Sequence, residues 1–260
     1  MHRPTFVIAC ALAAAACSKP EEKPAQMADT TAAPAAAPAP APAPQHQAIV
    51  TVIYKWPKSP AAFEKYYPGH VKLVGDQKAE IGFTKAELTK FSTSLDGKKP
   101  QFYRQAELYF PSMDAAKKGI ATEGFTKVGD DLPKFATGGL IALIAEETGD
   151  KSDTPCPALV TVIYNQPKDA AAFESYYSAT HLPIVGAGQA EIGFVRADLT
   201  KFDSNLDGST PAAEYRQAEL CFPSMDALKK GTATPAFKKV GDDFKNFATG
   251  GLAGLIGEQK

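Results

Sequence analysis

Two histidines, His70 and His181, are of a residue type and stand at a spacing from aromatic residues that could support proton transfer. Each closely follows a pair of adjacent tyrosines, Tyr66-Tyr67 in one case and Tyr176-Tyr177 in the other. A neutral imidazole with a pKa near about 6.5 can take or give a proton at working pH. Aromatic walls around it would suit a flat apolar ligand. The same pattern also fits a hydrogen-bonded histidine in an aromatic core, so both interpretations stand.

The surroundings of His181 make it the stronger candidate. Phe173, Tyr177 and His181 fall four residues apart, so one face of a helix carries all three. We therefore predict His181 as an acid–base residue. The predicted ligand-binding residues around it are Tyr164, Phe173, Tyr176, Tyr177 and Arg216, and their candidates in the other half of the chain are Tyr67 and His70.

Two arginines, Arg104 and Arg216, stand in the repeated motif YRQAEL. Alternation along a strand places Arg104 on the same face as Ala106 and Leu108, which is mostly apolar. A charge on such a face needs a partner. Asp130, Asp131 or a ligand carboxylate are the candidates, and an ion pair within the protein is the plainer interpretation.

Other chemistries find no support in the sequence. The glycine-rich GGLAGLIG lies in the last predicted strand without a following helix, which excludes a dinucleotide fingerprint. LDG occurs twice but lacks the further acidic ligands of a calcium loop, and no cluster has zinc spacing. The net charge of -1 and the scattered lysines argue against nucleic acid as a partner. No cofactor or metal is evident.

The elements that position these residues occur twice. The segments AEIGF, YRQAEL, FPSMDA, KVGDD and FATGGL each appear once in either half. The offset between matched residues is 110 at Tyr54 and Tyr164 and 111 at His70 and His181, which indicates a one-residue insertion between them. Solenoid repeats run about 20 to 50 residues, so a unit of roughly 100 indicates a duplicated domain.

Each unit predicts the element order β-α-β-β-α-β of a ferredoxin-like domain. Strands are expected at 49–54, 79–91 and 101–110, with a turn at Asp96-Gly97, and again at their counterparts in the second half. Pro183 is expected to end or kink the helix just after His181. One face of such a sheet carries helices, and the other face is expected to pack against the second copy. We predict an α+β chain that forms an intrachain pseudo-dimeric α/β barrel and is a monomer.

The first residues are typical of a secretory leader rather than of the fold. Thr5 to Ala16 is apolar and too short to span a bilayer. The run from Leu12 to Cys17 resembles a lipoprotein cleavage box, which makes Cys17 the acylated first residue; a plain signal peptidase site is the alternative. Serine after Cys17 favours the outer membrane over the inner. The expected location is therefore the periplasmic side of the cell envelope.

The domain boundaries follow from composition. We expect a signal peptide at 1–16, a lipidated Cys17 with an Ala/Pro-rich disordered tether at 17–47, a first repeat at 48–147, a linker at 148–157 and a second repeat at 158–260. Cys156 precedes the first strand of the second repeat and Cys221 lies near the end of its third. These strands are antiparallel neighbours in a ferredoxin-like sheet, so we predict a Cys156–Cys221 disulfide in an oxidising compartment.

The second repeat, with Phe173 to Tyr177, then Thr180-His181-Leu182-Pro183, and later GDD and FATGG, resembles the EthD family of the dimeric α/β-barrel superfamily. The resemblance extends over 49–146 and 159–258. The first repeat reads GHVKLV where the family has His-x-Pro. The resemblance implies action on small organic compounds, often beside a monooxygenase system, without a settled reaction.

Three hypotheses follow. The first is an enzyme of the oxidoreductase type acting on a small apolar or aromatic compound, with His181 as acid–base residue. The second is a module that binds such a ligand without chemistry. The third is a structural envelope lipoprotein in which duplication serves stability. A ligand cavity that touches His181 would favour the first two over the third.

Overall fold

The computed structural model describes residues 47–147 and 156–260. The predicted leader, Cys17, the tether and most of the predicted linker lie outside these residues. The first repeat consists of β1 (Gln47–Tyr54), α1 (Pro60–Asp76), α2 (Lys78–Ile81), β2 (Lys85–Ser94), β3 (Arg104–Phe110), α3 (Met113–Ile120), α4 (Glu123–Asp131), a 3₁₀ turn (Leu132–Lys134) and β4 (Leu140–Glu147). The second repeat consists of β5 (Ala158–Tyr164), α5 (Ala170–Tyr176), a π-helical turn (Tyr177–His181), α6 (Leu182–Ile192), β6 (Arg196–Asn205), β7 (Arg216–Phe222), α7 (Met225–Thr232), α8 (Pro235–Asp243), a 3₁₀ turn (Phe244–Asn246) and β8 (Leu252–Gln259).

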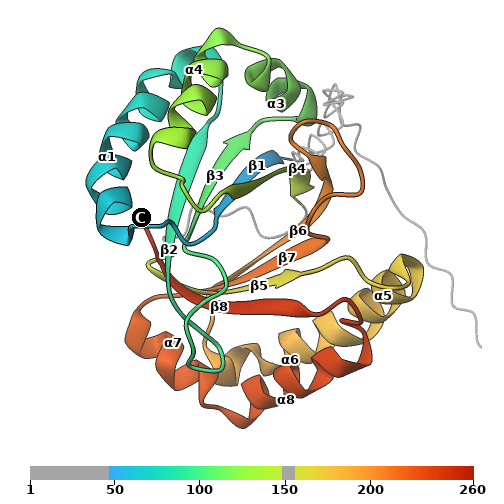
Figure 1. Ribbon diagram of the computed structural model, residues 1–260. Helices are drawn as coiled ribbons and strands as arrows, with labels where there is room; N and C mark the ends of the chain where they lie inside the picture. Colours follow the sequence, from blue (N-terminus) through green and yellow to red (C-terminus); the bar gives the residue numbers. More distant parts are fainter. Residues whose placement is uncertain (1–46, 148–155) are drawn as a thin grey trace, which may run out of the picture. The chain divides into compact units, whose positions relative to one another are not determined.

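The eight strands close into one antiparallel barrel in the order β1-β3-β2-β8-β5-β7-β6-β4. Two seams join the repeats, where β2 pairs with β8 and β4 pairs with β6. The helices of the first repeat cover one side of the barrel and those of the second cover the opposite side (Figure 1). The predicted pseudo-dimeric α/β barrel within one chain is thereby confirmed. Closure leaves no sheet edge exposed, which is the usual solution for such strands.

Local sequence signals explain where the elements begin. The side chain of Ser59 accepts a hydrogen bond from the Ala62 amide and Pro60 follows it, so α1 starts there. Thr234 and Pro235 start α8 in the same way. The predicted strand over 79–91 begins too early, because residues 78–81 form the short helix α2 before Gly82 turns the chain at a φ of 82°. Among the described residues, no helix has both the length and the apolar character needed to cross a bilayer.

The barrel interior holds polar side chains as well as an apolar cluster. Gln105 of the first repeat donates to Glu219 of the second at 3.1 Å, and Gln217 donates to Glu107 at 2.8 Å. These reciprocal bonds cross the barrel from one repeat to the other. All four side chains are buried, and buried hydrogen bonds of this kind fix the relative position of the two sheets.

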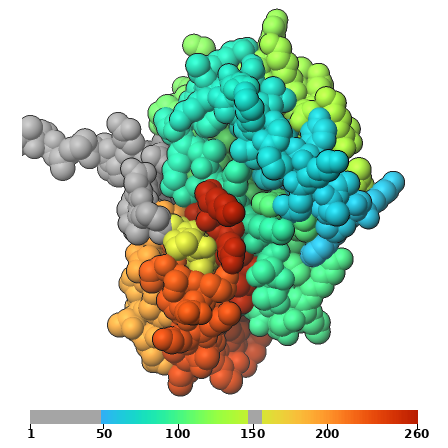
Figure 2. Space-filling model, turned by 90° about the vertical axis from the view of Figure 1, so that its left-hand side faces the viewer, coloured from blue at the N-terminus to red at the C-terminus, as the bar shows by residue number. Residues whose placement is uncertain are grey.

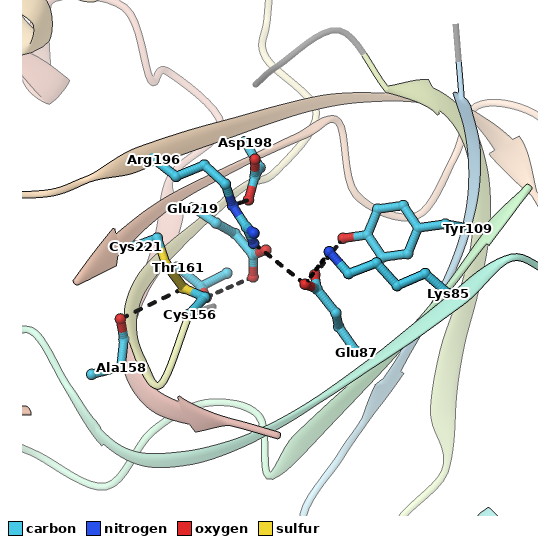
Figure 3. The surroundings of a disulfide bond; sticks show 10 residues. All are labelled: Lys85, Glu87, Tyr109, Cys156, Ala158, Thr161, Arg196, Asp198, Glu219 and Cys221. Carbon is cyan, nitrogen blue, oxygen red and sulfur yellow. Dashed lines mark hydrogen bonds and ion pairs between the residues drawn. A yellow bond between two sulfur atoms is a disulfide. The ribbon is translucent and has the colours of Figure 1, made fainter. Parts of the chain in front are cut away.

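A charged group occupies one end of the barrel (Figure 3). Arg196 bonds Asp198 at 2.8 Å and Glu87 at 3.4 Å, while Lys85 pairs with Glu87 at 2.5 Å and the Tyr109 hydroxyl donates to Glu87 at 2.7 Å. These residues come from strands of both repeats. The ion pairs therefore add a second link between the repeats, at the cost of removing several charges from water.

The disulfide between Cys156 and Cys221 lies beside this charged group, with a Cα–Cα distance of 5.3 Å. It is the pair expected from the strand order, since β5 and β7 are antiparallel neighbours in which Leu159 faces Cys221. Both cysteines are buried. The bond joins the start of the second repeat to the end of its third strand.

Replacing Glu219 with glutamine is expected to stabilise the protein at alkaline pH. Burial and the neighbouring Glu107 carboxylate raise the pKa of Glu219 well above its ordinary value of 4.5. A group with a raised folded-state pKa contributes stability that is complete below the unfolded pKa and is lost as the pH rises toward the folded pKa. Glutamine keeps an oxygen acceptor for Gln105 and Thr161 and does not titrate.

Denaturant unfolding of both proteins between about pH 4 and pH 9 measures this effect. The free energy of unfolding of Glu219→Gln should exceed that of the wild type by a margin that grows with pH. The exposed Glu258, changed to glutamine, serves as the control and should show no such margin. A constant difference across the whole pH range would contradict the expectation.

Candidate functional site

A cavity of about 980 Å³ lies between the outer face of the sheet in the second repeat and helices α6 and α8. Its wall is mostly apolar, which is usual for sites that bind small organic molecules. The apolar lining comes from the strands, from both helices and from one residue of the first repeat. It includes Val160, Val162, Leu182, Val185, Phe194, Leu199, Leu220, Phe237, Val240, Phe244, Leu252, Leu255 and Leu95.

His181, Tyr177 and Tyr164 add further aromatic rings to this wall. The rings of Tyr177 and His181 stack with centroids 5.5 Å apart, and Phe247 lies 4.5 Å from the His181 ring on another side. His181 is only 3 % exposed and Tyr177 only 2 %. The imidazole is therefore held in one orientation by packed aromatics at the edge of the cavity.

A π-helical turn, Tyr177–His181, places this histidine. The first repeat runs through the equivalent stretch as one continuous helix, α1, with Tyr67 and His70 three residues apart. The second repeat has one more residue between its tyrosine and its histidine, and a helix absorbs an extra residue by forming i→i+5 hydrogen bonds locally. Pro183 was expected to end or kink the helix; it does not end it, because α6 continues to Ile192. It stands in the first turn of α6, where its missing N–H costs nothing.

Asp243 holds the other side of the imidazole. Its carboxylate lies 2.8 Å from Nδ1 of His181 and also accepts hydrogen bonds from the Tyr176 hydroxyl and the Asn246 amide, each at 2.8 Å. Burial opposes ionisation of Asp243, but these three hydrogen bonds outweigh it and lower its pKa. An ionised carboxylate only accepts, so Nδ1 carries the proton and Nε2 keeps a free lone pair.

Burial also lowers the pKa of His181 below its ordinary value of 6.5, and the hydrogen bond to Asp243 offsets only part of that effect. The imidazole is therefore neutral at pH 7. Within the described part of the chain, Nε2 has no hydrogen-bond partner. The arrangement leaves a proton acceptor at the cavity wall, oriented by a carboxylate behind it.

Tyr177 lines the cavity with its ring, while its hydroxyl oxygen is buried beneath the cavity surface. This oxygen has no hydrogen-bond partner among the described residues. Burial raises the pKa of Tyr177 to about 12, although the nearby Arg216 lowers it in part. The hydroxyl therefore stays protonated at neutral pH.

Arg216 does not reach the cavity. Its guanidinium forms two hydrogen bonds to Glu174 on α5, from Nε at 2.9 Å and from Nη2 at 2.6 Å. It also lies 4.9 Å from the centre of the Tyr177 ring. The expected partners Asp130 and Asp131 are thus wrong for the arginines, since Arg104 pairs in the same way with Glu64. Arg216 supports the ring of Tyr177 from behind.

The other predicted ligand-binding residues divide into two groups. Phe173 packs behind Tyr177 at 5.5 Å, and Tyr176 is occupied by Asp243, so neither lines the cavity. His70 and Tyr67 lie in the first repeat, away from this cavity. His70 there bonds Asp131 at 2.9 Å and repeats the pairing seen at His181.

Three features of the site escaped the sequence analysis. The role of Asp243 was signalled only by the repeated GDD motif. The π-helical turn was signalled by the change of offset between the matched tyrosines and histidines. The contribution of Leu95 from the first repeat had no local signal, because it depends on how the repeats pack. The described residues contain no cluster of three or more histidine, cysteine or carboxylate side chains suited to a metal ion.

Comparison with known proteins gives a consistent result. The sequence pattern of the EthD domain matches residues 55–139 and again residues 165–251. An uncharacterized 11.0 kDa protein in the thcB-thcC intergenic region of Rhodococcus erythropolis is 38% identical over 101 residues, which cover 39% of this chain and 93% of that protein. It therefore corresponds to a single repeat.

Two solved structures share the fold over most of the chain. One is an anthrone oxidase-like protein, with a TM-score of 0.55 and 14% identity, covering 83% of this chain and 93% of the other. The second is a putative monooxygenase from Lactobacillus acidophilus NCFM, with a TM-score of 0.50 and 15% identity, covering 82% and 94%. At these identities the likeness extends to the fold alone.

Proposed function

The chain belongs to the EthD family, and from that premise we propose that its second repeat binds and transforms a small apolar or aromatic compound that carries a hydroxyl or carbonyl group. His181 is the acid–base residue of this site. The observation that carries the proposal is the neutral imidazole, tied to Asp243 through Nδ1, at the wall of the apolar cavity.

The geometry supports a proton transfer. Nε2 of His181 accepts the proton of a phenol, an enol or an activated C–H bond, and Asp243 stabilises the imidazolium that forms.

Oxidation is the reaction class to test first. An anion produced by His181 is electron-rich, and an external oxidant such as dioxygen would accept its electrons. The solved structures that share the fold include proteins described as an anthrone oxidase-like protein and a putative monooxygenase. Fold does not fix chemistry, so these descriptions guide the choice of assay only.

A non-catalytic binding module is the second candidate. The pairing of His181 with Asp243 recurs as His70 with Asp131, and both rings pack among aromatic side chains. A pairing present in both repeats fits a structural role for the dyad. In that case the cavity would hold its ligand without changing it.

Calorimetric titration of the protein with 4-hexylphenol tests the proposal by measuring binding. Mass spectrometry of the phenol after incubation with the protein in air then shows whether the compound has been transformed. Binding with oxygenated product supports an enzyme, and binding without product supports the binding module. An absence of binding to 4-alkylphenols of any chain length would contradict both candidates.

We further propose that the chain is lipid-anchored at Cys17 in the cell envelope, on the periplasmic side of the outer membrane, and works as a monomer. The apolar leader and the Ala/Pro-rich tether support the anchor. The Cys156–Cys221 disulfide fits an oxidising compartment. Closure of the barrel by two repeats of one chain supports the monomer.

Protein extracted from membranes is expected to begin at Cys17 with a diacyl or triacyl modification. The reason is that the short apolar segment before Cys17 resembles a lipoprotein signal. Intact-mass measurement checks the result, and a Cys17→Ser variant, which cannot be acylated there, serves as the control. An unmodified mature protein found wholly in the soluble fraction would contradict the anchor.

A further inference from the structure

We propose that the loop between β2 and β3 of the first repeat selects ligands for the cavity of the second repeat, with Leu95 setting the length of ligand that fits. The inference rests on the proposed function of that cavity and names a substrate class for it. The ligand is an elongated apolar molecule with a hydroxyl group at one end.

The loop lies against the opposite repeat. Figure 1 shows the segment after β2 reaching down beside β8, and Figure 2 shows it alongside the second repeat on the outer surface. Ser94 at the end of β2 and five residues of the loop line the cavity, and the five are Leu95, Asp96, Lys98, Lys99 and Gln101. Leu95 also packs onto the apolar core of the second repeat. The cavity is therefore incomplete without the first repeat.

Leu95 is fixed where it enters the cavity. Its backbone N–H donates to the carbonyl of Gly254 on β8 at 2.9 Å. A side chain at Gly254 would meet the Leu95 side chain, since a Cβ built there lies 2.6 Å from Leu95 Cδ1. The space for Leu95 thus depends on glycine at this position. Leu206 of the second repeat donates to the Ala142 carbonyl in the equivalent way, so the matched position of the first repeat carries a methyl group where Gly254 has none.

The loop is held in shape from both sides. Gly97 adopts a φ of 78°, and the Lys98 amide donates to the Ser94 hydroxyl at 3.1 Å. The indole of Trp56 donates to the Pro100 carbonyl at 2.7 Å, and Lys99 lies 3.8 Å from the centre of its ring. Such a loop forms a fixed wall, and fixed walls discriminate by size.

The cavity has two chemically distinct lining regions. One carries the Nε2 acceptor of His181, and the other is formed by Leu95 and its loop. A phenolic head therefore binds His181 while its apolar tail extends toward Leu95. The volume of about 980 Å³ stands at the upper end of the range usual for small-molecule sites, which suits a tail rather than a single ring.

A series of 4-alkylphenols of increasing chain length tests the inference. Dissociation constants are measured by calorimetry, with the fluorescence of Trp56, the single tryptophan, reporting on the loop. Wild-type affinity should rise about fourfold per methylene until the tail reaches Leu95, and then fall. Leu95→Ala should move this maximum to tails longer by about two methylene groups.

Two further variants sharpen the result. Leu206→Ala, the matched change in the second repeat's own loop, should leave the maximum where it is. Gly254→Ala places a methyl group in the space of Leu95 and should move the maximum to shorter tails. Leu95 and Gly254 are both half-buried, so both variants are expected to fold. Thermal unfolding of each variant checks this.

The outcomes separate the two proposals. An unchanged maximum in Leu95→Ala, with binding still dependent on His181, would overturn the selector and leave the proposed function standing. Equal shifts in Leu95→Ala and Leu206→Ala would also overturn it, because only the first loop lines this cavity. If the wild type binds no member of the series, the proposed function fails, and the selector fails with it.

Discussion

Alanine at position 181 is expected to weaken 4-hexylphenol binding at least about tenfold, whereas alanine at position 70 leaves it within about twofold. A hydrogen bond to a well-placed partner contributes about 1 kcal/mol and more where charge is involved, and about 1.4 kcal/mol corresponds to a factor of ten. His181 lines the cavity and His70 does not. If the site is catalytic, turnover should fall about 100-fold or more, as removal of an acid–base residue generally does.

Stability provides the control for this comparison. Both alanine variants leave a buried carboxylate, Asp243 or Asp131, without its histidine, so both should lower the melting temperature. His181→Asn keeps an amide N–H that can reach Asp243 and lacks the Nε2 acceptor, so it should restore stability without restoring binding. A ligand affinity unchanged in folded His181→Ala would make the histidine a core residue only.

The pH dependence of binding follows from the same group. Burial lowers the pKa of His181 below 6.5, so the imidazole stays neutral above that pH. Phenol binding in the wild type should therefore be constant between about pH 8 and pH 6.5 and weaken only on further acidification, as Nε2 becomes protonated. His70→Ala should follow the same profile.

Loss of the Cys156–Cys221 disulfide is expected to lower the free energy of unfolding by about 4 kcal/mol. Chain-entropy arguments give this size for a loop closed by cysteines with a sequence separation of 65. For a folded part of this length the melting temperature should fall by about 8 to 16 °C. Differential scanning calorimetry of Cys156→Ala/Cys221→Ala beside the oxidised wild type measures it. Alanine is chosen because both cysteines are buried.

Reduced wild type is the matched control, since it keeps both sulfur atoms and loses only the bond. It should unfold near the temperature of the double variant. Coinciding transitions for oxidised and reduced protein would show that the disulfide contributes nothing. The 4-hexylphenol affinity of the double variant should be unchanged, because neither cysteine lines the cavity.

Much of the fold could be predicted because it depends on short-range patterns. The strand-forming run before Tyr54, the caps at Ser59 and Thr234 and the glycine turn at Gly97 act within a few residues. Alternation along β3 separated Ala106 and Leu108 from Gln105 and Glu107, as the structure has them. Strict alternation would place Tyr103, just before β3, on the face of Gln105 and Glu107, but its ring packs with Phe63 of α1 and its hydroxyl donates to Glu64.

The sequence by itself determined the duplication, the barrel and the disulfide pair, and it predicted His181 rather than His70 as the acid–base residue. Each of these follows from residue type and spacing along one stretch of chain or from comparison of the two halves. Tertiary structure alone decided that Glu174 pairs with Arg216, that Asp243 orients His181, and that Leu95 completes the cavity of the other repeat. The physical reason is that buried charges and cavities depend on which distant groups meet across packed surfaces, and local patterns carry no information about that meeting.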